Sequence, residues 1–211
     1  LCELIHTDEE VTNDDKPTFA LRNRTKSSMR LAIDAVKEHK ADAVISAGNT
    51  GALMAMATIV LRTLPGISRP AIASSFPTQA GDSVMLDLGA NVECDSNNLV
   101  QFAVMGEVYA RNELGLSQPS VGILNVGVEG LKGNDSVRDA AAILKNSNLP
   151  LEFYGFIEGD DIGKGTVDVI VTDGFTGNIA LKTAEGTAQM IAFFLKDALK
   201  SSILSKAGAL L

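Results

Sequence analysis

The sequence predicts an α/β fold, a three-layer and mostly parallel sheet with helices on both faces. Short apolar runs typical of buried strands alternate with helical patterns of about 10 to 17 residues, as in a sheet covered on both sides. Most of the glycine-rich turns follow a strand-like run directly. The chain has 211 residues, 45% of them hydrophobic, and can bury a sizeable core. We expect a single α/β domain over residues 1–211.

The first part of the chain is expected to hold a loop, two helices and one short strand. Residues 7–17 are acidic and turn-rich. Apolar residues then recur at helical spacing over about 27–40, and residues 43–45 have the pattern of a short buried strand. Asn49 or Thr50 can cap the next helix, which the Pro65-Gly66 pair ends.

The middle of the chain predicts a hairpin followed by alternating helices and strands. Residues 70–76 and 84–88 are strand-like, and the segment between them has a length typical of a hairpin, so we expect an antiparallel excursion. A helix over about 98–114, a strand over 121–124 and a helix over about 135–146 follow.

The last part is expected to contain two strands, an acidic loop between them and a long final helix. The strands are predicted over 151–157 and 167–172. The apolar face of the final helix is wider than one contact with a sheet requires. This face can belong to the core, to a second subunit or to a membrane surface.

Composition and charge exclude several classes of function. The net charge of −8 argues against bulk nucleic-acid binding, which needs clustered cations. A local group, Arg22, Arg24, Lys26 and Arg30, either docks an acidic partner or is a solvated helix entrance. The longest uncharged apolar run, 52–61, is far shorter than the roughly 20 residues of a membrane span.

The cysteines and histidines make metal or histidine chemistry a poor expectation. The two cysteines lack metal-like spacing, and without a secretory segment they indicate a reducing compartment. Two histidines supply little for nucleophilic catalysis or a metal site. The chain starts without methionine and stops inside an apolar helical pattern, so we interpret it as the central part of a longer protein.

The glycine loop at 46–51 predicts a site for a small anion. Lying between a strand and a helix, it can present backbone N–H groups and a helix dipole to phosphate. It lacks both the spacing of dinucleotide sites and the Gly-Lys-Ser/Thr ending of nucleoside triphosphate loops. The alternative is that the glycines serve only the geometry of the turn.

Three later loops carry side chains suited to acyl or phosphoryl chemistry. Asp87 and Asn91 bracket a turn, where Asp87 is a base, an orienting group or a cap. Lys132 shares a loop with Glu129 and can stabilise negative charge or donate a proton, unless it is simply exposed. Asn178 can donate to a developing oxyanion or cap the helix that it begins.

Six ordered motifs make the chain similar to the bacterial acyl-ACP:phosphate acyltransferases of phospholipid synthesis. The resemblance extends from about residue 6 to residue 205. The motifs are SAGNTGALM at 46–54, RPA at 69–71, LDLGAN at 86–91, QFAVMG at 101–106, KGN at 132–134 and DGFTGNIALKT at 173–183.

This resemblance implies transfer of a fatty acyl group from the thioester of acyl carrier protein to inorganic phosphate. It implies no metal and no organic cofactor. The family fold resembles isocitrate and isopropylmalate dehydrogenases and the phosphate acetyltransferases. Its members are homodimers attached peripherally to the cytoplasmic membrane, and a downstream glycerol-3-phosphate acyltransferase is a further expected partner.

The resemblance also assigns site residues. It places Lys132 and Asn178 in catalysis, with Asn178 donating to the oxyanion and Lys132 orienting phosphate or protonating the departing thiolate. The expected phosphate or acyl contacts are Asn49, Thr50, Gly51, Asn91, Glu129, Thr176 and Gly177. The family's N-terminal Asp-Ala-Met-Gly-Gly-Asp motif and C-terminal His-Gly-Ser segment do not occur in these residues, and 128–131 is less charged than in the family.

Other interpretations stay open at this point. Acyl transfer between phosphate and coenzyme A would use the same anion loops with a nucleotide pocket. A noncatalytic membrane scaffold would bind carrier protein without turnover. An NAD-dependent dehydrogenase rests on fold analogy alone and lacks the dinucleotide fingerprint.

Overall fold

The computed structural model describes residues 2–200, and the chain divides into two compact units, Leu1–Pro70 and Ala71–Leu211. The strands of the described chain all belong to the second unit. The assignment of one domain to residues 1–211 stays a prediction.

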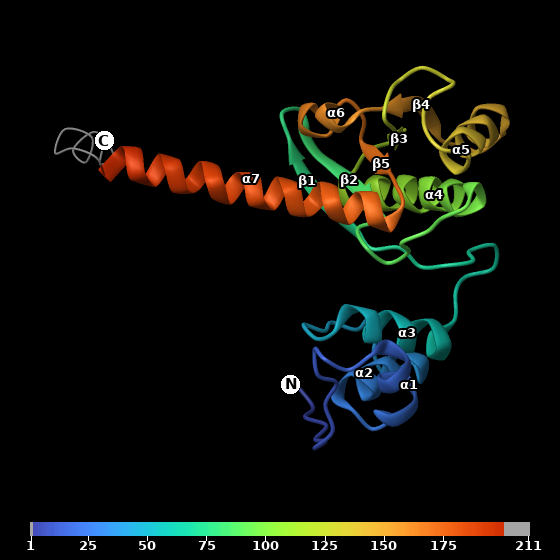
Figure 1. The fold of residues 1–211 in the computed structure, drawn as a ribbon. Helices are drawn as coiled ribbons and strands as arrows, with labels where there is room; N and C mark the ends of the chain where they lie inside the picture. The colour runs from blue at the N-terminus through green and yellow to red at the C-terminus, as the bar shows by residue number, and fades with distance from the viewer. Residues whose placement is uncertain (1, 201–211) are drawn as a thin grey trace. The chain divides into compact units, whose positions relative to one another are not determined.

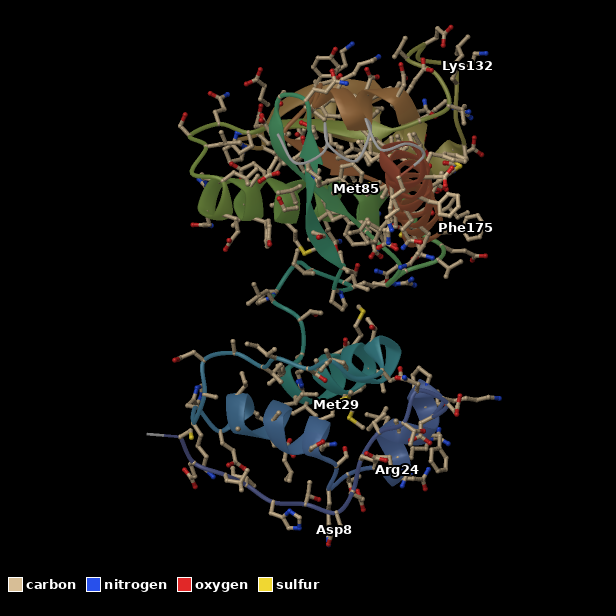
Figure 2. The ribbon with its side chains drawn as sticks, turned by 90° about the vertical axis from the view of Figure 1, so that its left-hand side faces the viewer. Asp8, Arg24, Met29, Met85, Lys132 and Phe175 are labelled. Atoms are coloured by element: carbon tan, nitrogen blue, oxygen red, sulfur yellow. The ribbon has the colours of Figure 1, made fainter. Side chains whose placement is uncertain are left out.

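The first unit is helical over its described residues. It contains α1 (Pro17–Asn23), α2 (Ser28–Lys37) and α3 (Thr50–Leu61). Pro17 opens α1, a helix that sequence periodicity missed, and Ser27 caps α2. The helices bury one small apolar cluster that includes Ala20, Met29 and Met56. Figure 2 shows Met29 among these helices.

The strand predicted over residues 43–45 is wrong. The structure assigns no strand there, and the side chain of Ile45 is 97% exposed. A strand needs a neighbour that accepts and donates its backbone hydrogen bonds, and no other strand lies within residues 2–70. The apolar pattern alone therefore does not make this segment a strand.

The second unit is built on one five-stranded sheet, seen in Figure 1. Its strands are β1 (Ala73–Thr78), β2 (Gly81–Leu86), β3 (Ser120–Leu124), β4 (Glu152–Ile157) and β5 (Val169–Val171). The order is β1-β2-β5-β3-β4, and all neighbours are parallel except β1 and β2. The sequence predicts this antiparallel pair as an excursion from the sheet. In the structure both strands belong to the sheet, and β1 forms one of its edges.

Helices cover both faces of this sheet, giving three layers. The side chains of Val84 and Leu86 join the core cluster of α4 (Ser96–Glu113) and α5 (Asp135–Asn146). Met85, between them, belongs to the cluster on the other face, with residues of α6 (Gly159–Lys164) and α7 (Gly174–Lys200). This alternation follows from the period of two in a strand.

The helix α6 lies where the sequence predicted only an acidic loop. Its first turn carries Asp160 and Asp161, and Gly165 ends it in the left-handed conformation with φ 73°. Acidic residues at a helix N-terminus and glycine after its end both favour helix. The missed signal was therefore capping chemistry in a segment too short for periodicity.

The C-terminal half of α7 extends beyond the sheet in Figure 1. Its large apolar side chains are mostly exposed, including Ile191 at 58%, Phe193 at 66% and Phe194 at 60%. None of the helices within residues 2–200 combines the length and hydropathy needed to cross a membrane. The part of the predicted apolar pattern beyond residue 200 lies outside the described residues.

Candidate functional site

Three loops of the second unit meet at the carboxyl edge of the sheet. Because β2, β5 and β3 run parallel, the helices that follow them, α4, α7 and α5, all begin at this edge. A polar cavity of about 580 Å³ is lined from all three helix starts, by residues that include Cys94, Asn134, Ser136, Asp173 and Thr176. The positive ends of three helix dipoles lie at this cavity, whose lining also includes the carboxylates of Glu93 and Asp173.

The helices α5 and α7 are also capped by their own side chains at this edge. Asn134 accepts the N–H of Val137 at 2.9 Å. Asp173 accepts the N–H of Thr176 at 2.8 Å and its hydroxyl at 3.0 Å. Thr176, an expected phosphate contact, therefore also serves the cap of α7.

The turn after β2 is organised by Asp87, whose side chain is fully buried. One carboxylate oxygen accepts the backbone N–H groups of Ile72, Gly89 and Ala90, at 3.0, 3.2 and 2.9 Å. The other accepts the backbone N–H of Asn91 at 2.7 Å and its amide N–H at 2.9 Å. Asp87 is thus an internal anion that shapes the turn, and Asn91 is oriented by it.

Two glycines let the start of α7 lie directly on this turn. A Cβ on Gly177 would fall well inside 3.0 Å of the Asp87 carbonyl oxygen, and one on Gly174 would meet the backbone nitrogen of Asn91 at 2.8 Å. Gly174 also donates its N–H to the Asn91 carbonyl at 2.7 Å. Any side chain at these positions would push α7 away.

The same contact places Asn178 beside the turn. Gly89 has φ +131°, and a Cβ there would lie 3.6 Å from the side-chain carbonyl oxygen of Asn178. Asn178 itself is exposed. The structure therefore brings Asn178, Gly177 and the turn holding Asn91 together at one edge of the sheet.

Glu129 and Lys132 come together in the loop after β3. Lys132 donates its backbone N–H to the Glu129 carbonyl at 2.9 Å, and both side chains flank the buried Gly127. Asn125 holds the loop closed, because its amide donates to the carbonyls of Gly127 at 3.0 Å and Lys132 at 3.2 Å. Figure 2 shows Lys132 at the surface on this loop. Sequence reasoning missed Asn125, although an Asn directly after a strand is a turn signal.

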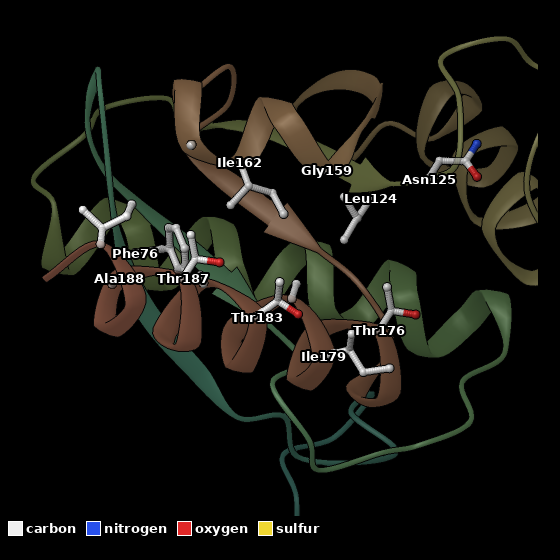
Figure 3. Close-up of a pocket in the computed structure, with 14 residues that line it drawn as sticks. Phe76, Leu124, Asn125, Gly159, Ile162, Thr176, Ile179, Thr183, Thr187 and Ala188 are labelled. Carbon is white, nitrogen blue, oxygen red and sulfur yellow. The ribbon is translucent and has the colours of Figure 1, made fainter. Parts of the chain in front are cut away.

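An apolar cavity of about 670 Å³ runs along α7, as Figure 3 shows. From α7 it is lined by Thr176, Ile179, Thr183 and Thr187, among others. Phe76, Leu124, Asn125 and Ile162 line it from the sheet, the β3 loop and α6. Thr176 also lines the polar cavity, so an apolar chamber adjoins the polar edge.

The predicted contacts of the 46–51 loop lie in the first unit, where Asn49 has a structural role. It caps α3 by accepting the N–H of Ala52 at 3.0 Å. Its amide donates to the carbonyls of Thr12, Asn13 and Asp15 at 3.3, 3.2 and 3.0 Å. Thr50 begins α3, and Gly51 lies against Pro17. A ligand role for these three residues stays a prediction.

The basic group of the first unit is partly neutralised. The guanidinium of Arg24 is 3.2 Å from the Asp15 carboxylate, and that of Arg30 is 3.0 Å from Asp34. These ion pairs weaken the interpretation of the group as a docking surface for an acidic partner. Within residues 2–200, no group of three or more His, Cys, Asp and Glu side chains is arranged around a metal position.

Fold and site together define a class of α/β protein with a polar cavity at the carboxyl edge of its sheet, next to an apolar cavity. The chain belongs to the family described as fatty acid synthesis protein, whose model matches residues 1–211. This finding agrees with the family resemblance in the sequence.

Proteins named phosphate acyltransferase are similar to the whole chain. That of Paramagnetospirillum magneticum is 62% identical over 100% of the chain and 60% of its own length. That of Rhodospirillum centenum is 66% identical over 98% of the chain and 58% of its own length. The chain therefore spans about three fifths of the curated relatives that it matches.

Two solved structures share the fold. They are the EutD phosphotransacetylase of Staphylococcus aureus, with TM-score 0.56 and 22% identity, and a phosphotransacetylase of Streptococcus pyogenes, with 0.60 and 21%. Each match covers 75% of this chain, and 55% and 54% of the respective structures. The likeness to isocitrate and isopropylmalate dehydrogenases stays a prediction.

Proposed function

We propose that the protein transfers a fatty acyl group from the thioester of acyl carrier protein to inorganic phosphate. A phosphate oxygen attacks the thioester carbonyl, the carbon–sulfur bond breaks, and the products are acyl phosphate and the free carrier thiol. Relatives named phosphate acyltransferase, 54–66% identical, support phosphate as the acceptor. The reaction makes the protein an enzyme of fatty acid and phospholipid synthesis.

The apolar cavity along α7 is the observation that carries this proposal. A volume of about 670 Å³ is in the range of pockets that bury a drug-sized ligand, and it far exceeds the needs of an acetyl group. It begins at Thr176, which also lines the polar cavity. A thioester carbonyl at this junction would have its chain in the apolar cavity and phosphate among the helix N-termini.

Asn178 and Lys132 supply the chemistry in this arrangement. The amide N–H of Asn178 donates to the oxyanion that forms when phosphate adds to the carbonyl. Lys132 orients phosphate by its charge or gives a proton to the departing thiolate. The remaining proposed contacts with phosphate or the acyl group are Asn91, Glu129, Thr176 and Gly177 in the second unit and Asn49, Thr50 and Gly51 in the first.

Acyl transfer between phosphate and coenzyme A is the second candidate. The observation that favours it is the fold shared with two solved phosphotransacetylases. It predicts that an acyl-coenzyme A is the better donor and that short chains suffice, which leaves the apolar cavity without a purpose. A noncatalytic scaffold predicts binding of carrier protein without any turnover.

The exposed end of α7 supports proposals about assembly and location. Met190, Ile191, Phe193, Phe194 and Leu195 are each more than half exposed. We assign this apolar surface to a homodimer contact or to peripheral attachment at the cytoplasmic face of the membrane. There the acyl phosphate would pass to a downstream glycerol-3-phosphate acyltransferase.

The test is phosphate-dependent release of free carrier protein from a long-chain acyl carrier protein, with acyl-coenzyme A as a parallel donor. Lys132→Ala and Asn178→Ala should each lower kcat at least about 100-fold. Lys145→Ala and Asn112→Ala, which remove the same side-chain types from exposed helix positions outside the site, should keep kcat within about threefold. Absence of phosphate-dependent turnover in the folded natural protein would reject the proposal.

A further inference from the structure

The carboxylate of Asp87 is buried, and both of its oxygens accept hydrogen bonds. Its two oxygens receive five N–H donors at 2.7 to 3.2 Å, and its side chain is fully buried. All five partners donate, which suits an ionised carboxylate, since that group only accepts. A buried charge is costly unless such donors surround it.

The backbone of Asp87 connects this turn to β5 and α7. Asp87 donates its N–H to the carbonyl of Thr172 at 3.0 Å, just after β5. Its own carbonyl lies so close to Gly177 that no Cβ fits between them. The residue after Gly177 is Asn178, whose side chain lies against Gly89 in the same turn. Asp87 therefore binds the turn that lies beside Asn178 and contacts the backbone of the residue before it.

We propose that Asp87 is the positioning residue that places the Asn178 amide for the transfer step. The inference rests on the proposed function, because it assumes that Asn178 donates to the reacting carbonyl. Asp87 does not itself meet substrate, since its side chain is buried and both of its oxygens are bonded within the turn. It acts through the backbone of 88–91 and through the start of α7.

The substitution Asp87→Asn tests the carboxylate with almost no change in size. The new side-chain amide would keep one oxygen for the backbone N–H groups of Ile72, Gly89 and Ala90. Its NH₂ group would face the two donors of Asn91, which would lose this acceptor. The turn would then have to rearrange, and a displacement of about 1 Å at Asn178 is enough to slow the reaction on the order of 100-fold.

Asp168 provides a matched control at the opposite edge of the same sheet. Its carboxylate accepts the N–H of Ser120 at 2.8 Å and the hydroxyl at 2.7 Å, at the starts of β3 and β5. Asp168 lies at the amino ends of β3 and β5, and the carboxyl edge is at the other ends of these strands. Asp168→Asn should therefore lower stability and leave kcat per folded molecule within about threefold.

The experiment is a double-mutant cycle in the full natural protein, with palmitoyl carrier protein and inorganic phosphate as substrates. Asp87→Asn should lower kcat about 100-fold and change KM for the donor less than about threefold, after correction for the folded fraction from circular dichroism. In the Asn178→Ala background the same change should lower kcat less than about threefold further, since the residue that it positions is gone. Asp87→Glu should be similarly impaired, because the longer side chain displaces the turn.

The outcomes separate this inference from the proposed function. If Asp87→Asn behaves like Asp168→Asn, or if its effect multiplies fully with that of Asn178→Ala, Asp87 does not act through Asn178 and the inference is overturned. If the unchanged protein shows no phosphate-dependent release, the proposed function itself fails.

Discussion

Gly177→Ala should lower both the stability and the activity of the protein, because this glycine lies where α7 meets the turn that Asp87 organises. The added methyl group would lie 2.8 Å from the Thr172 side chain and closer still to the Asp87 carbonyl oxygen, below the 3.0 Å that real Cβ contacts keep. The obstacle is the backbone carbonyl of Asp87, a residue whose carboxylate is fixed by five hydrogen bonds, so α7 must move.

The magnitude follows from two opposing terms. Alanine in place of glycine inside a helix gains about 1 kcal/mol. Overpacking costs about 1–3 kcal/mol, and rigid backbone puts this case at the upper end. The net loss is about 2 kcal/mol, which for a chain of this size lowers Tm by about 4–8 °C. A shift of α7 also displaces Asn178, so we expect kcat to fall about 100-fold.

Gly186→Ala is the control in the same helix. Nothing lies within 4 Å of a Cβ at this position in the described chain, so only the helix propensity changes. We expect a gain of about 1 kcal/mol, a Tm about 2–4 °C higher and unchanged activity. Thermal unfolding followed by circular dichroism and the phosphate-dependent transfer assay measure both effects. If Gly177→Ala matched Gly186→Ala in Tm and kcat, the contact between α7 and the turn would not exist as described.

Three further changes test the cavity, the first unit and the acid side of stability. Ala184→Phe fills part of the apolar cavity and should lower kcat/KM for a palmitoyl donor at least about tenfold relative to a butyryl donor; an equal loss for both would argue against an acyl chain in this cavity. Asn49→Ala should cost about 1–2 kcal/mol in denaturant unfolding, and Asn49→Asp at least as much, because its carboxylate would face three carbonyl oxygens; a neutral Asn49→Asp would contradict the donors assigned to that amide. The backbone N–H of Glu158, together with the Thr166 hydroxyl, lowers the pKa of Asp161, so its carboxylate stabilises the fold above about pH 4 and this stabilisation is lost as the pH falls through the lowered pKa. Asp161→Asn should therefore make the free energy of unfolding fall less steeply at acid pH. An unchanged fall would show that Asp161 does not contribute to it.

The parts of the fold that could be predicted from sequence are those governed by local patterns. The helices α4 and α5 and the strands β3 and β4 lie close to their predicted ranges, because apolar periodicity and caps such as Asn134 act within a few residues. The failures are also local. Residues 43–45 have a strand pattern without a partner strand, and α1 and α6 are too short for periodicity to detect.

The candidate site was predictable as a set of loops and not as a geometry. Glycine-rich turns after strands indicate the carboxyl edge of a parallel sheet, and the loops that carry Lys132, Asn178 and Asn91 follow parallel strands of the second unit at that edge. The roles of these three residues stay predictions. Asn125 was missed because its two acceptors are loop carbonyls that only the folded loop brings to it.

The sequence by itself determined the alternation of elements, the helix caps and the types of side chain at each loop, since hydrogen bonds and periodicity over a few residues decide these. Only the tertiary structure decided the strand order, the five hydrogen bonds that the Asp87 carboxylate accepts, and the close approach of α7 to the Asp87 turn at Gly177. These features join residues about ninety positions apart, whose contact depends on how the whole sheet is assembled and leaves no local pattern.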